Sequence, residues 1–132
     1  MKLLRTVLYV NAVVTTAVGV ILVLVPSFVL NTLFDLNPYP ENAWVRIAGI
    51  EAVGLAMIMV LVAQSVEKLY WWAWAFLFVD VAMATLITFK VIAGLGAGAG
   101  SKLWWLLGGG ATLLAAGLLV GLGKAGRETP AV

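Results

Sequence analysis

The sequence contains no cysteine and no histidine among its 132 residues. These absences exclude disulfides, thiol nucleophiles, zinc sites of the cysteine–histidine type and imidazole-ligated haem. A Ser-His-Asp catalytic relay is excluded as well, because it requires the imidazole. No nucleophile or metal-ligand set accompanies the acidic residues, so we expect no metal site, no cofactor and no enzymatic activity.

Charged residues are also scarce, at 11% of the chain, whereas 64% of the residues are hydrophobic and the mean hydropathy is +1.10. A soluble domain carries about a quarter charged residues, because it needs a solvated surface. A lipid bilayer removes this need by solvating the apolar exterior. The basic residues are scattered near helix ends, which is typical of membrane orientation and argues against a nucleic-acid partner.

Long apolar runs predict four transmembrane helices, since about 20 residues cross the hydrocarbon core. The predicted spans are residues 3–25, 43–64, 70–93 and 102–122. Pro26 suits the first turn of a new helix, so we expect a short interfacial helix over 27–34 after the first span. The fold class is therefore an all-α, polytopic four-helix bundle over residues 1–123. Residues 124–132 are predicted to form a disordered cytoplasmic tail.

Tryptophans near the predicted helix ends are typical of the headgroup level, where indole rings prefer to lie. One interface collects Trp44, Trp104 and Trp105, and the other collects Trp71 and Trp72.

The distribution of basic residues predicts the orientation. If the N-terminus is inside, the cytoplasmic side collects Lys2, Arg5, Lys68, Lys124 and Arg127, and the outer side collects Arg46, Lys90 and Lys102. This excess favours both termini inside a cytoplasmic (inner) membrane.

Two acidic residues, Glu51 and Asp80, lie deep within predicted spans, where a charged carboxylate costs several kcal/mol unless it is paired, hydrated or protonated. Neither has a basic residue at its own depth, so we expect at least one of the two carboxyls to be protonated. On the first helix, Asn11 and Thr15 lie one turn apart at a similar depth. We expect Asn11, Thr15, Glu51 and Asp80 to form a polar cluster in the centre of the bundle. Such a cluster could bind a proton or cation, or simply bond the helices together.

Small residues at helical spacing predict where helices approach closely, because they let backbones come together in lipid. Ala48, Ala52 and Ala56 form one such seam on the second span. Gly117 and Gly121 form a small-xxx-small pair on the fourth span. That pair predicts packing against a neighbouring helix of the same chain or contact with a partner subunit.

The second span opens with Arg46-x-x-Gly49 followed by Gly54-Leu55, and the first span is followed by Pro26. This pattern resembles an uncharacterised family of small four-helix bacterial membrane proteins. The resemblance implies a location in the bacterial cytoplasmic membrane and implies no activity. Asp80 in the third span departs from that pattern.

Three functions are compatible with the sequence. The first is a non-catalytic accessory subunit that packs against a larger membrane complex or against itself, since the chain has short loops and small-residue helix faces. The second is a small proton- or cation-coupled transporter or channel that uses the carboxylates at mid-membrane depth. The third is a bundle that binds a lipid or another hydrophobic ligand. The lipid bilayer is an expected partner in each case.

Overall fold

The described residues of the computed structural model are 1–28, 43–90, 92 and 101–128, and every regular element within them is helical. In chain order these elements are α1 (Lys2–Leu24), α2 (Pro26–Phe28), α3 (Ala43–Gln64), α4 (Val66–Leu69), the 3-10 turn η2 (Tyr70–Trp72), α5 (Ala73–Lys90) and α6 (Ser101–Glu128). No strand occurs in these ranges, as the predicted all-α class requires.

Four stretches of helix are long and apolar enough to cross a membrane, namely Lys2–Leu24, Trp44–Gln64, Val66–Phe89 and Trp105–Glu128. They match the four predicted spans in number and order. The third begins earlier than predicted, because α4 and η2 continue almost directly into α5. Four apolar helices of this length suggest a membrane protein.

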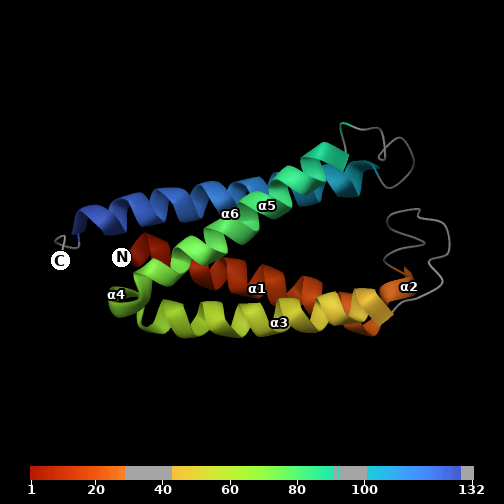
Figure 1. Ribbon diagram of the computed structural model, residues 1–132, viewed down its shortest axis with the longest axis horizontal. Helices are drawn as coiled ribbons and strands as arrows, with labels where there is room; N and C mark the ends of the chain where they lie inside the picture. The colour runs from red at the N-terminus through yellow and green to blue at the C-terminus, as the bar shows by residue number, and fades with distance from the viewer. Residues whose placement is uncertain (29–42, 91, 93–100, 129–132) are drawn as a thin grey trace.

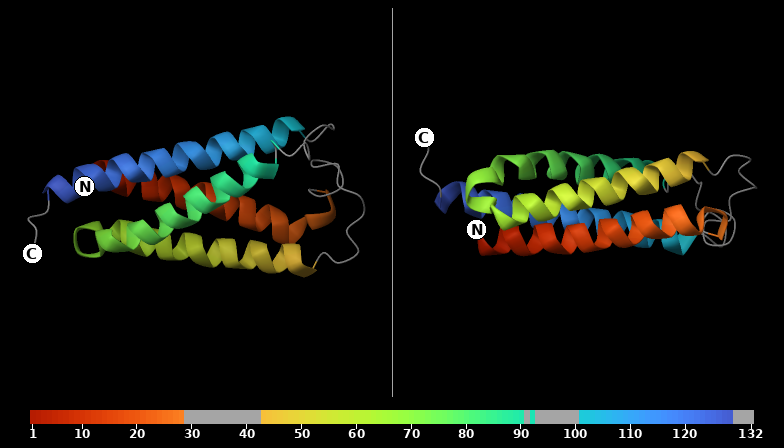
Figure 2. Two further views of the ribbon diagram at one scale, coloured as in Figure 1. Left: turned by 45° about the horizontal axis from the view of Figure 1, so that its top comes forward. Right: turned by 90° about the horizontal axis from the view of Figure 1, so that it is seen from below.

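The long helices run alternately up and down the bundle (Figure 1). Both termini and the turn around α4 lie at one end, which we call the terminal end. α1 lies along α3, and α5 lies along α6, as the further views show (Figure 2). α6 also packs against α1, whereas α3 and α5 touch only sparingly. α1 therefore connects the two helix pairs.

The core is largest near the terminal end, where the big apolar side chains are buried. Leu4, Leu8, Val66 and Leu118 are fully inaccessible there. Farther along α1 the buried positions become smaller or polar, with Asn11, Ala12 and Gly19 in sequence. Large buried leucines therefore fill the core at the terminal end, whereas smaller residues let the helix backbones come closer together farther along α1.

α1 and α3 approach most closely where two glycines meet. A Cβ atom built on Gly19 would lie 2.7 Å from the carbonyl oxygen of Gly49, and one built on Gly49 would lie 2.6 Å from that of Gly19. Only glycine tolerates such an approach of two backbones. The buried seam of α3 then continues through Ala52 and Ala56.

This seam corrects the predicted one at its first position. Ala48 is exposed and Gly49 is buried in its place, while Ala52 is half-buried and Ala56 is fully buried. Successive residues lie about 100° apart around a helix, so the face that meets α1 is turned by one residue from the predicted face. Residues 49, 52 and 56 are three and four residues apart, so they also share one helix face. The small residues in the sequence fit this seam as well as they fit the predicted one.

The glycine pair of α6 packs against α1 within the same chain. A Cβ atom on Gly121 would lie 3.1 Å from Cα of Leu4, and one on Gly117 would lie 3.3 Å from Val7. Of the two predicted roles for Gly117 and Gly121, the structure shows the intramolecular one.

The helices that follow α1 and that end the chain differ from their predicted bounds. A short helix follows α1, as predicted, and begins at Pro26, one residue before the predicted range; residues 29–34 of that range lie outside the described residues. The tail predicted from residue 124 is instead helical to Glu128. Ala125 is fully buried and belongs to the core, and Glu128 pairs with the N-terminal ammonium group, so α6 continues because its last turns pack on α1.

The glycine contact generates a stability prediction. We expect Gly49→Ala to lower the free energy of unfolding by about 1–3 kcal/mol, because the added methyl group would force the α1 backbone away. The free energy of unfolding is measured by SDS titration in mixed micelles, with circular dichroism as the readout.

The matched control is Gly54→Ala on the same helix, where nothing lies within 4 Å of an added Cβ atom. This variant should keep the native stability or gain slightly, since alanine favours helix over glycine. Equal stability of the two variants would contradict the close approach of α1 and α3.

Candidate functional site

A buried hydrogen bond joins α1 to α5 in the interior of the bundle. The side-chain amide of Asn11 donates from Nδ2 to Oδ2 of Asp80 across 2.6 Å. Asn11 is 1% exposed and Asp80 is 8% exposed, so water has little access to the bond. A hydrogen bond to a carboxylate in such surroundings is stronger than one between neutral groups in water.

Thr15 extends this contact along α1. Its hydroxyl donates from Oγ1 to Oδ1 of Asn11 across 3.2 Å. The hydroxyl and the amide thus form an ordered chain of donors that ends on Asp80. Throughout the described part of the chain, no buried side-chain nitrogen or oxygen lacks a hydrogen-bond partner. The three residues, which we call the polar cluster, satisfy one another.

Helical periodicity explains why these side chains meet. Leu4, Leu8, Asn11 and Gly19 lie on the buried face of α1. On α5 the buried face carries Ala73, Phe76, Leu77, Asp80 and Ile87. Residues three or four apart share a helix face, so the polar residues enter the interior on the same stripes as the apolar core.

Glu51, the fourth residue predicted for this cluster, lies elsewhere. Its side chain is exposed on the outer surface of α3, and it forms no hydrogen bond or ion pair with any described residue. The reason is angular: Glu51 is about 200° around the helix from Gly49, which faces α1. The structure therefore brings Asn11, Thr15 and Asp80 together and turns Glu51 outwards.

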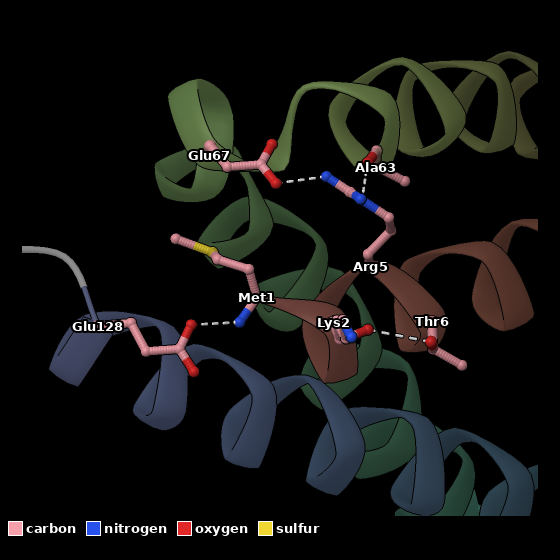
Figure 3. A network of polar contacts seen from close by, with 7 residues as sticks. All are labelled: Met1, Lys2, Arg5, Thr6, Ala63, Glu67 and Glu128. Carbon is pink, nitrogen blue, oxygen red and sulfur yellow. Dashed lines mark hydrogen bonds and ion pairs between the residues drawn. The ribbon is translucent and has the colours of Figure 1, made fainter.

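A second polar network lies at the terminal end (Figure 3). Arg5 donates from Nε to the carbonyl oxygen of Ala63 across 3.0 Å and pairs through Nη2 with Glu67. The N-terminal ammonium group of Met1 pairs with Glu128 at 2.5 Å. These contacts tie the start of α1 to the end of α3 and to the end of α6.

The sequence reasoning assigned Arg5 only to membrane orientation and did not predict its pairing. The available signal was the presence of opposite charges, Arg5 and Glu67, at the same end of adjacent predicted spans. Both side chains are partly exposed, and solvent screens ion pairs of this kind, so the pair adds little stability. The network therefore serves mainly to hold the register of α1, α3 and α6.

A groove of about 370 Å³ lies between α5 and α6, toward the end opposite the termini. It is lined by Ile87, Thr88, Trp105, Gly108, Gly109, Thr112 and Leu113. The hydroxyl of Thr112 donates to the carbonyl oxygen of Gly108 in its own helix. The walls are mainly apolar, so the groove suits a hydrophobic chain better than a charged solute.

The predicted tryptophan anchors lie near the two ends of the bundle and are exposed. Trp44 (65%) and Trp105 (62%) lie near the first residues of α3 and α6, whereas Trp71 (65%) and Trp72 (58%) lie at the turn before α5. The side chain of Trp104 is outside the described residues.

No protein-family model, curated protein or solved structure matches this chain. Within the described ranges, no group of three or more acidic side chains lies close enough to hold a metal ion. The polar cluster consists of a carboxyl group that accepts from the Asn11 amide, which in turn accepts from the Thr15 hydroxyl.

The polar cluster generates a prediction about helix association. In a double-mutant cycle with Asn11→Ala and Asp80→Ala, we expect a coupling energy of about 0.6–2 kcal/mol, because each substitution removes the same interhelical bond. The measurement is the free energy of unfolding of the four proteins in mixed micelles.

The control is a second double-mutant cycle, which combines Asn11→Ala with Thr85→Ala. The hydroxyl of Thr85 donates to the carbonyl oxygen of Val81 within α5 and does not reach α1. We expect no coupling with Asn11 in this second cycle. A coupling near zero for Asn11 and Asp80 as well would show that the bond contributes nothing to the fold.

Proposed function

We propose that the chain is an integral protein of the bacterial cytoplasmic membrane, with four spanning helices and both termini inside. Three observations support this topology. Four helices have the length and apolarity to span. Both termini lie at one end of the bundle (Figure 1), and exposed tryptophans lie near both ends. The excess of basic residues at the terminal end supports the inside assignment, and α2 would lie at the outer interface.

Within that membrane, we propose that the protein acts as a non-catalytic accessory subunit that packs against a larger membrane complex. The observation that carries this proposal is the exposure of Glu51. At about 1.5 Å rise per residue, Glu51 lies about 12 Å from the start of α3 and about 20 Å from its end. A carboxylate that faces lipid at this depth costs several kcal/mol. Another protein that covers this part of α3 would remove the cost.

The polar cluster supports the same proposal from inside the bundle. Asn11, Thr15 and Asp80 satisfy one another. Their arrangement suits a bond between helices better than a coupling site for transport. A transporter that used Glu51 and Asp80 together would need both acids on one pathway, whereas one is exposed on α3 and the other is buried between α1 and α5.

The groove between α5 and α6 favours a second candidate function, the binding of a lipid or another hydrophobic ligand. Its volume of about 370 Å³ lies within the usual range of ligand sites. Its apolar walls match an acyl chain. Lipid binding there is compatible with the subunit role, because α3 is not among the helices that line the groove.

The subunit role is tested by extracting a tagged chain from its native membrane in mild detergent. We expect a stoichiometric membrane protein to accompany it, identified by mass spectrometry of the purified sample. An unrelated tagged four-helix protein at the same expression level provides the control for non-specific capture. Recovery of the tagged chain as a lone monomer would contradict the proposal.

The lipid role is tested by filling the groove. We expect Gly109→Leu to abolish most of the lipid that remains bound in native mass spectra, because Gly109 lines the groove and has open space around it. Gly110→Leu is the matched control, since Gly110 also has open space but does not line the groove. Equal lipid retention by both variants would remove the lipid hypothesis.

A further inference from the structure

The outer face of α3 carries one acidic side chain among small and apolar residues. We call it the Glu51 face and define it by Ile47, Ala48, Glu51, Gly54 and Ile58, all of which are exposed. These positions recur three or four residues apart, so they form one stripe along the helix. Ala48 and Gly54 flank Glu51, and nothing lies within 4 Å of a Cβ atom added to Gly54. The backbone of another helix can therefore approach Glu51 closely.

Nothing in the described chain neutralises Glu51. It has no hydrogen bond and no ion pair there, and the side chains around it on the Glu51 face are apolar. The glutamate side chain reaches only a few ångströms, so it cannot extend to the headgroups as a lysine or arginine could. An ionised Glu51 must therefore find its positively charged partner at its own depth in the membrane.

A second copy of this chain offers no base at that depth. All eight basic residues are near predicted helix ends. The nearest in sequence is Arg46, which lies about 7.5 Å toward the start of α3 and about 140° around it from Glu51. A two-fold pairing of Glu51 faces would bring acid against acid. Any positive charge that pairs with an ionised Glu51 at this depth must therefore come from a chain of different sequence.

We infer that the Glu51 face binds a transmembrane helix of another protein that carries a lysine or arginine at the depth of Glu51. This inference rests on the proposed subunit role and names the chemistry of the contact. Charged residues within spans occur in pairs for the same energetic reason. Ala48 and Gly54 give the basic side chain access to the carboxylate from either side.

The test uses photo-crosslinking in the native membrane, with the full-length chain. Benzoylphenylalanine replaces Ile58 on the Glu51 face, and in a separate protein it replaces Leu119 on α6. Both side chains are exposed, at 45% and 55%, and α6 packs against α1 and α5 rather than α3. We expect a crosslinked adduct from position 58 and none from position 119. Fragment mass spectrometry then identifies the partner helix.

The charge requirement is tested in the same assay. Glu51→Leu should lower the adduct from position 58 by about tenfold or more, because the partner's base then lies unpaired. Glu51→Lys should abolish the adduct. A partner in which glutamate replaces the basic residue should form the adduct with the Glu51→Lys variant but not with the unchanged chain. Circular dichroism of each purified variant, including its thermal transition, confirms that the bundle itself is unchanged.

Each alternative outcome has a distinct meaning. An adduct with a second copy of the chain, or one that persists in Glu51→Leu, would overturn the inference. An adduct from position 119 alone would also overturn it but would leave the subunit role intact. The absence of any protein adduct from either position, together with no co-extracted partner, would overturn both.

Discussion

The hydrogen bond from Asn11 to Asp80 lies where the two helix pairs of the bundle meet. α1 packs along α3 through the glycine contact and against α6 through Gly117 and Gly121. α5 runs beside α6, and the hydrogen bond of Asp80 joins it to α1. An apolar interface between helices in lipid gains little from the hydrophobic effect, since lipid tails are equally apolar. A polar bond and close backbone contact therefore decide which faces meet, and α1 provides both.

The number and order of the helices were predictable, because run length and apolarity determine them directly. The facing of each helix was harder to predict. The assumption that an intramembrane polar side chain faces the interior placed Asn11, Thr15 and Asp80 together correctly but was wrong for Glu51. The other residues of α3 are mostly apolar, so its sequence is compatible with a seam that starts at Ala48 and with one that starts at Gly49. The partner glycine on α1 selects the second seam, and this choice turns Glu51 away from the interior.

The end of α6 was also not predictable from the local sequence. Residues Gly123 to Glu128 contain two glycines and two basic residues, and this local composition is typical of a polar tail. The helix continues because Ala125 is buried in the core and Glu128 meets the N-terminal ammonium group. The ion pair joins residues at opposite ends of the chain. Local propensity is a weak guide where tertiary packing supplies most of the helix stability.

The two intramembrane acids represent two ways in which a helix bundle can accommodate a carboxyl group. Asp80 points inwards, where an amide donor from a neighbouring helix meets it, so it adds to the cohesion of the bundle. Glu51 points outwards on α3, which among the described residues packs extensively only against α1 and leaves the Glu51 face exposed. A contact on the Glu51 face therefore requires no rearrangement of the polar cluster or of the glycine seam. The fold is complete without Glu51, and this independence allows the residue to serve an intermolecular contact.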